Sequence, residues 1–182
     1  AETSSPIKDN KLSPRIKETA KSLWGVYLIL TIMCMVFYKL AGMNFFDAIG
    51  HSFSTVSIGG FSTHNESIGY YSSDYIKIIC MVFMFLSALN FVLHFLFYKT
   101  KSFNNYFSNS EAKTFIVIIM GLLILVFLFS IGGRLSSINN IDLIFHVLSF
   151  VTTSGFTVSD YNIWPTFIIT LIFLSSFIGA CA

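Results

Sequence analysis

Charged residues are scarce in this 182-residue chain, since Asp, Glu, Lys and Arg together make up only 11% of it. A soluble domain carries about 25% and needs them to cover its surface. The formal net charge of +2 is also too small for the basic surface of a nucleic-acid-binding protein. Hydrophobic residues account for 54% of the chain, and the mean hydropathy is +0.74. We therefore predict an integral membrane protein with lipid as its main solvent and no nucleic-acid partner.

Cysteine and proline are rare as well, with three residues of each type. So few prolines, together with 21 phenylalanines, exclude a disordered chain. Cys34, Cys80 and Cys181 lie within apolar runs and lack the spacing of a disulfide framework or a zinc site, so we interpret them as core thiols. The apolar runs also lack a nucleophile paired with a base. We expect neither an enzyme nor a covalently bound cofactor.

The two ends of the chain suggest an internal piece of a longer membrane protein. The first residue is Ala1 rather than Met, and Ala182 falls within an apolar run. The polar stretch before the first apolar run is too long for the n-region of a signal peptide. We therefore expect further sequence on both sides.

Four apolar runs are long enough to cross a bilayer as helices: residues 23–42, 75–98, 114–133 and 163–182. About 20 helical residues reach about 30 Å, the thickness of the hydrocarbon core. The stretches between the first and second runs and between the third and fourth are too polar to cross. Each opens with a half-length apolar segment and then a glycine-containing turn, which predicts a re-entrant hairpin. The expected fold class is all-α integral membrane.

Basic residues indicate the orientation of these runs. Lysine and arginine gather before the first run and between the second and third runs: Lys8, Lys11, Arg15, Lys17, Lys21, Lys99, Lys101 and Lys113. The two re-entrant regions together contain a single basic residue, Arg134. The positive-inside rule then makes residues 1–22 a cytoplasmic lead-in and residues 99–113 a cytoplasmic linker. Both re-entrant regions are expected outside.

An internal repeat relates the two halves. A shift of 95 residues superimposes 8 identical residues within positions 44–61, including Asn44 on Asn139, Asp47 on Asp142 and His51 on His146. Both repeats, residues 23–98 and 114–182, run in the same direction. Parallel repeats imply an axis along the membrane normal. We expect tandem helix–pore-loop–helix units like those of potassium-channel pores.

The re-entrant segments have the features of a cation site. Asn44 and Asn139 can cap the short helices, and Asp47 and Asp142 reinforce their positive ends. The negative ends then point into the membrane, where they stabilise a cation. Backbone carbonyls after each helix can replace the hydration shell of an alkali cation. The segments concerned are Val56, Ser57, Ile58, Gly59, Gly60 and Phe61, and Val151, Thr152, Thr153, Ser154, Gly155 and Phe156.

The segment from His51 to His64, HSFSTVSIGGFSTH, resembles a filter region of the Trk/Ktr/HKT potassium transporters, closest to the bacterial TrkH-type subunits. Thr152 to Thr157 resembles that family's next filter. The resemblance implies potassium as the substrate, four repeats around one pore, and this chain as the second and third of them. It also implies a multi-pass protein of the bacterial inner membrane, a homodimer of the full-length subunit, and a cytosolic nucleotide-binding regulatory subunit.

The resemblance further implies a gate in the last helix, whose leading edge is Ser175, Ser176, Gly179 and Ala180. A channel or transporter for another monovalent cation, or a non-transporting membrane scaffold, remains an alternative to potassium uptake. Four polar residues after the filter segments either make an outer vestibule attractive to cations or are solvated loop residues: His64, Asn65, Glu66 and Asp160.

Polar residues within the apolar runs allow two readings. Ser87, Asn90 and His94 are spaced to share one helical face. They either line a cavity or make helix–helix hydrogen bonds, and we favour hydrogen bonds. His51 and His146 recur inside the short helices, which favours a common packing or hydrogen-bonding role behind the filter.

Overall fold

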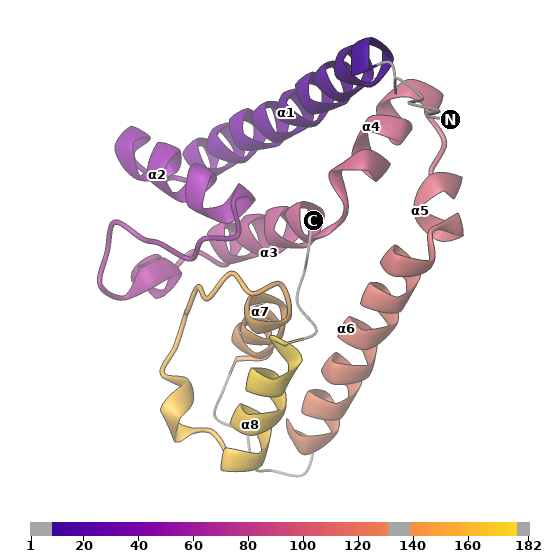
Figure 1. The fold of residues 1–182 in the computed structure, drawn as a ribbon. Coiled ribbons are helices and arrows are strands. Elements are labelled where there is room, and N and C mark those ends of the chain that lie inside the picture. Colours follow the sequence, from indigo (N-terminus) through magenta and orange to yellow (C-terminus); the bar gives the residue numbers. More distant parts are fainter. Residues whose placement is uncertain (1–8, 131–138, 178–182) are drawn as a thin grey trace, which may run out of the picture.

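The computed structural model describes residues 9–130 and 139–177, and every helix or strand assigned within these ranges is a helix (Figure 1). Lys8, Arg134, Gly179, Ala180 and Cys181 lie outside the described residues. The α-helices are α1 (Asp9–Leu40), α2 (Phe45–Val56), α3 (Asp74–Ala88), α4 (Phe91–Thr100), α5 (Asn104–Ser108), α6 (Ser110–Phe129), α7 (Asn140–Val151) and α8 (Thr166–Ser175). Two 3₁₀ turns are also present, η1 (Ser67–Tyr70) and η3 (Tyr161–Ile163).

The order of elements repeats along the chain. A long helix, a 12-residue helix, a 3₁₀ turn and another helix occur first as α1, α2, η1 and α3, and again as α6, α7, η3 and α8. The short helices α2 and α7 begin at Phe45 and Asn140, which are one repeat length apart. The repeat predicted from sequence is therefore also a repeat of helices.

Two of the predicted membrane spans are long straight helices. Within α1, the segment Glu18–Leu40 is long and apolar enough to cross a membrane, and so is α6. Only 22% of the apolar window in each is buried inside the protein, so most of their side chains face outward. The fourth predicted run appears as α8, which has 10 residues before the described part ends.

The second predicted span is broken rather than one continuous helix, although α3 and α4 together are long and apolar enough to cross a membrane. The chain bends by 92° between α3 and α4. Leu89, with ψ of 146°, and Asn90, with ψ of 122°, leave the helical conformation there. The Asn90 side chain accepts a hydrogen bond from the Val92 N–H at 2.9 Å and so starts a new helix. Ser87, Asn90 and His94 therefore do not share one helical face.

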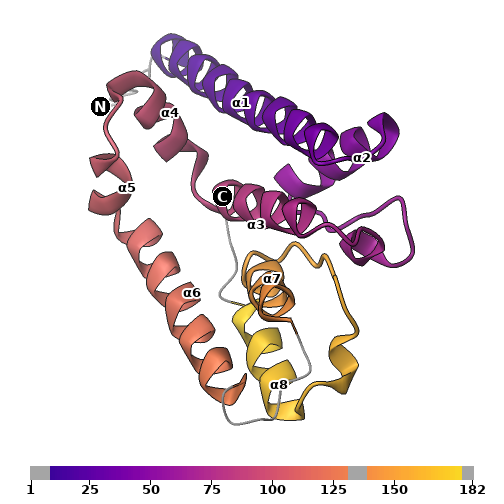
Figure 2. The same ribbon diagram turned by 180° about the vertical axis from the view of Figure 1, so that it is seen from behind.

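Each repeat has its own buried core, and the two cores touch. The first is built around Cys34, Tyr38 and Cys80, and the second around Val147 and Ile168. Phe145 and Phe156, from the second repeat, are buried within the first core. From either side, α3 lies between α1 and α2 on one flank and α7 on the other (Figures 1 and 2).

Candidate functional site

The two short helices start in the same way. Asn44 is the N-cap of α2, and its side chain accepts a hydrogen bond from the Asp47 N–H at 2.7 Å. Asn139 is the N-cap of α7, and its side chain accepts one from the Ile141 N–H at 3.2 Å. Both caps satisfy N–H groups that a helix start leaves without a partner.

The segments that leave these helices follow the same backbone path. Ser57 and Thr152 both keep helical dihedral angles, with φ of −79° and −78°. Ile58 and Thr153 then turn left-handed, with φ of 55° and 61°. A left-handed conformation is rare for β-branched residues and costs roughly 1–3 kcal/mol. Its presence at matching positions indicates that both segments are held in one unusual conformation.

Matching hydrogen bonds hold that conformation in both repeats. The Gly59 N–H donates to the Ser54 carbonyl at 2.8 Å, and the Ser154 N–H donates to the Ser149 carbonyl at 2.9 Å. The N–H groups of Ile58 and Thr153 likewise donate into the last turns of α2 and α7. The donors of both segments therefore point back to the helix ends.

Glycine is required at Gly60 for two reasons. Its φ is 68°, in the left-handed region, and an added Cβ would overlap the Ser154 carbonyl oxygen of the other repeat. The matching Gly155 has φ of 79°, and an added Cβ there would meet no atom within 4 Å. The contact at Gly60 shows that the two segments lie directly against each other.

A buried carboxylate fixes the loop that follows the first segment. Asp47, only 3% exposed, accepts hydrogen bonds from Thr63 at 2.6 Å and Tyr71 at 2.8 Å, and its Oδ2 lies 2.9 Å from His64 Nε2. Burial would raise the pKa of Asp47, but the hydrogen bonds from Thr63, His64 and Tyr71 outweigh it and hold that pKa well below its usual range. Asp47 is therefore ionised at neutral pH.

The matching carboxylate of the second repeat has a different partner. Asp142 Oδ1 lies 2.7 Å from the Nζ of Lys77, a nearly buried lysine of α3. Lys77 also lies 3.5 Å from Asp74 Oδ1. The ion pair between Lys77 and Asp142 joins the two repeats.

Comparison with known proteins identifies the family of the chain. The sequence pattern of the TrkH family, described as cation transport protein, matches residues 1–182. The chain belongs to the TrkH family.

Relatives within this family are similar over nearly the whole chain. The Trk system potassium uptake protein TrkH of Halomonas elongata is 45% identical, over 97% of this chain and 37% of the relative. The Trk system potassium uptake protein TrkG of Escherichia coli is 40% identical, over all of this chain and 38% of the relative. The chain thus spans a little over a third of the length of these TrkH-family relatives.

A solved structure of the family has the same fold. The crystal structure of the potassium transporter TrkH from Vibrio parahaemolyticus superimposes with a TM-score of 0.87 and is 44% identical. The match covers 93% of this chain and 37% of that one. The all-helical membrane fold predicted from the sequence is confirmed by this match, and the chain is a member of a transporter family.

Two histidines and a tyrosine make hydrogen bonds to the short helices α2 and α7. His51 Nδ1 lies 2.8 Å from the Asp47 carbonyl, and His146 Nδ1 lies at the same distance from the Asp142 carbonyl. Both histidines are fully buried. The Tyr38 hydroxyl, from α1, is 2.8 Å from the Thr55 Oγ1 in the last turn of α2. The hydrogen-bonding role expected for the histidines is present in both repeats.

Matching phenylalanines have different surroundings. Phe156 is fully buried, with its ring centroid 6.4 Å from that of His51 in the first repeat. Phe61 is 81% exposed. The carbonyl oxygen of Phe156 accepts a hydrogen bond from Ser149 Oγ at 2.7 Å, so it faces the body of the repeat.

The residues expected near the gate are only partly described. Ser175 is buried and its hydroxyl donates to the Ile172 carbonyl, and the Ser176 hydroxyl donates to the Phe173 carbonyl at 2.7 Å. Both hydroxyls bond to carbonyls of α8, which ends at Ser175 with Ser176 as its C-cap.

Several residues that shape the site were missed by sequence reasoning. No sequence motif marks Thr63 and Tyr71, although both hold Asp47, and Lys77 stands within the apolar run 75–98. The one available signal was a lysine within a predicted span, because such a charge needs a partner. The sequence does not indicate which of the aspartates pairs with it.

Proposed function

We propose that this chain forms two of the four pore repeats of a potassium-uptake protein in the bacterial inner membrane. Residues 56–61 and 151–156 form two sides of its selectivity filter, with potassium as substrate. The observation that supports this most directly is the matching left-handed turn after α2 and α7. Relatives named as potassium uptake proteins support the same choice of ion.

The backbone of these segments suits a dehydrated cation. N–H groups that bond back to the helix ends leave carbonyl oxygens to face the opposite side. Alternating φ signs, negative at Ser57 and positive at Ile58 and Gly60, turn the intervening peptide groups and crowd their carbonyls together. The carbonyl ends of α2 and α7 add their negative dipoles. A cation between the two segments is stabilised by the carbonyl oxygens and by the helix dipoles.

The exposed Phe61 supports a pore with more repeats. Phe156 of the second repeat packs on His51 of the first. If each repeat packs on the one before it, Phe61 needs a preceding repeat to cover it. We propose that such a repeat lies upstream in the full-length protein and that another follows α8.

The same proposal includes the orientation of the chain in the membrane and its partners. The N-terminal side of α1 and the α4–α6 connection lie in the cytoplasm, and the η1 and η3 loops lie outside. We propose that the full-length subunit forms a homodimer and is regulated by a cytosolic nucleotide-binding subunit. The gate then follows Ser175 and Ser176.

Rubidium uptake tests the proposed activity. The full-length protein in liposomes should take up labelled rubidium, and external potassium should compete far better than sodium or ammonium. Liposomes without protein give the background. Equal competition by sodium would assign the pore to another ion, and no uptake above background would refute transport.

A further inference from the structure

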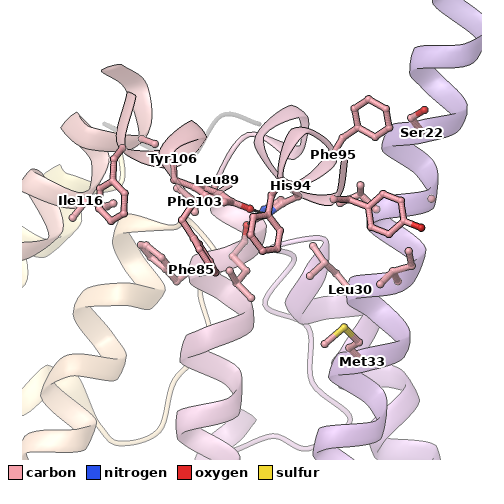
Figure 3. Close-up of a pocket in the computed structure, with 18 residues that line it drawn as sticks. Ser22, Leu30, Met33, Phe85, Leu89, His94, Phe95, Phe103, Tyr106 and Ile116 are labelled. Atoms are coloured by element: carbon pink, nitrogen blue, oxygen red, sulfur yellow. Dashed lines mark hydrogen bonds between the residues drawn. The ribbon is translucent and has the colours of Figure 1, made fainter. Parts of the chain in front are cut away.

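An apolar cavity of about 730 Å³ lies on the opposite side of the molecule from the filter segments, between α1, α3, α4, α5 and α6. Figure 3 shows Leu30 and Met33 on α1 facing Phe85, Phe95 and Phe103 across it. Its volume is within the range of about 300–1,000 Å³ typical of ligand sites. The 92° break between α3 and α4 displaces α4 from the axis of α3 and leaves room for this cavity.

The polar side-chain atoms of His94 and Tyr106 in the lining already have hydrogen-bond partners. His94 Nδ1 lies 2.7 Å from the Tyr106 hydroxyl, and His94 Nε2 lies 2.8 Å from the Leu86 carbonyl (Figure 3). Few donors or acceptors remain for water or a polar solute. An apolar lining of this kind favours apolar groups over polar ones. The lining therefore fits a hydrocarbon chain.

Lysine side chains adjoin lining residues on α1 and at the α4–α5 connection. Lys101 Nζ sits 4.6 Å from the ring centroid of Tyr98, which lines the cavity. Lys99 is exposed and follows Tyr98, and Lys21 is exposed and precedes the lining residue Ser22. The acidic residue Glu111, also exposed, precedes the lining residue Ala112 and is followed by Lys113. The exposed Glu18 lies one turn before Ser22 on α1, and its carbonyl accepts a hydrogen bond from the Ser22 hydroxyl. Lysines thus outnumber acidic groups beside this cavity.

We propose that the cavity binds an acyl chain of an anionic phospholipid whose phosphate lies against Lys21, Lys99 and Lys101. Basic pockets between helices on the cytoplasmic side favour anionic headgroups, because the inner leaflet is rich in such lipids. This inference rests on the proposed orientation, which places residues 99–113 in the cytoplasm. The cavity fits a lipid better than a segment of protein, because the lining is apolar while its surroundings are positively charged.

Gly25 offers a way to fill the cavity. It lines the cavity, and a Cβ added there would meet no atom within 4 Å. Gly121 on α6 also has nothing within 4 Å of an added Cβ, is exposed, and does not line the cavity. Gly25→Leu therefore removes acyl space, and Gly121→Leu is a matched control.

Lipid binding can be measured on the purified full-length protein by native mass spectrometry with added phosphatidylglycerol or phosphatidylcholine. The wild type should retain phosphatidylglycerol in preference. Lys99→Gln and Lys101→Gln should each weaken phosphatidylglycerol binding by about fivefold. Gly25→Leu should weaken binding of both lipids by about tenfold, because its side chain occupies the acyl site. Gly121→Leu should bind as the wild type does. Lys39→Gln should do the same, because Lys39 is in the last turn of α1 and does not line the cavity.

The outcomes separate this site from the transport proposal. Equal binding of the two lipids by the wild type, or equal binding by Gly25→Leu and Gly121→Leu, would overturn the lipid site whatever the rubidium uptake. A phosphatidylglycerol with a photoreactive acyl chain adds a readout that needs no variant. It should label peptides containing Phe85 or Phe103, and labelling confined to the outer faces of α1 and α6 would refute the site.

Discussion

Asp47 and Asp142 occupy the same position in the two repeats, but their carboxylates have different hydrogen-bond and ion-pair partners. Thr63, His64 and Tyr71 surround Asp47 within its own repeat. The positions that match them in the second repeat are Val158, Ser159 and Thr166, which do not offer the same donors. Lysine from the neighbouring repeat takes their place beside Asp142. One carboxylate thus fixes its own loop, and the other joins two repeats.

Replacing Asp47 with asparagine should lower the stability of the full-length protein at neutral pH. Hydrogen bonds to a charged group contribute about 1.5–3 kcal/mol, and Asp47 is nearly fully buried. Because folding lowers the pKa of Asp47, the stabilisation is present at neutral pH and starts to be lost as pH falls through the unfolded-state pKa of about 4. The difference in melting temperature between wild type and Asp47→Asn should therefore begin to shrink near pH 4 and be smaller at pH 3.

Thermal melting in detergent at several pH values measures this difference. Asp160→Asn is a suitable control because Asp160 is exposed and contacts only its own turn. A difference between wild type and Asp47→Asn that is constant from pH 7 to pH 3 would show that the charge of Asp47 does not stabilise the fold.

At the scale of whole elements, an ion pair between side chains 65 residues apart adds to the apolar packing of α3 against α7. Removing one partner of a buried pair costs about 3–5 kcal/mol, because the other charge stays buried. The pair here is slightly exposed, with 11% and 14% of the two side chains accessible, so the lower end applies. Asp142→Lys should be worse, since it opposes Lys77 and the positive end of α7.

The yield and melting temperature of the full-length protein measure this effect. Lys77→Met and Asp142→Lys should both reduce folded protein, and exchanging the charges in Lys77→Asp with Asp142→Lys should recover part of it. Asp74→Asn should have little effect, because Asp74 is half-exposed. If Asp142→Lys is as stable as Asp74→Asn, the ion pair does not hold the repeats together.

The elements could be predicted from the sequence wherever a local pattern determined them. Asn44 and Asn139 indicated where α2 and α7 begin, and the repeat indicated that they match. The bend at Leu89 and Asn90 was missed because no proline or glycine stands there. Asparagine in an apolar run indicates a polar helical face as readily as an N-cap.

The site was predictable as two segments but not as a packed pair. Glycine permits a left-handed φ at Gly60 and Gly155, whereas Ile58 and Thr153 give no such signal, since β-branched residues rarely adopt it. The overlap of a Gly60 Cβ with the Ser154 carbonyl depends on tertiary packing. Such long-range contacts have no local sequence pattern.

At the scale of the whole molecule, the proposed orientation predicts which loops can be labelled from outside. Cysteine introduced at Asn65, which is exposed in the outer loop, should react with an impermeant thiol reagent in intact cells. Cysteine at Ser108, which is exposed in α5, should react only after the cells are opened. The parental protein gives the background, and the native Cys34 and Cys80 are buried. Labelling of Ser108→Cys in intact cells would contradict the proposed orientation.

The central claim is that residues 56–61 and 151–156 form the cation filter. Its most direct test is the ratio of potassium to sodium uptake by the full-length protein, normalised to the amount in the membrane. Gly60→Ala forces a side chain into a left-handed position against the Ser154 carbonyl, and Gly155→Ala forces one into the matching left-handed position. Gly59→Ala is the control, because the second repeat carries Ser154 at that position. The exposed side chains of Ser57 and Phe61, which an added Cβ would approach, can both move.

Gly60→Ala and Gly155→Ala should each lower the preference for potassium by about tenfold, since about 1.4 kcal/mol between two ions is enough for this. Gly59→Ala should keep a preference close to that of the wild type. An unchanged potassium preference in both Gly60→Ala and Gly155→Ala would contradict the claim, because these segments would then not contact the ion.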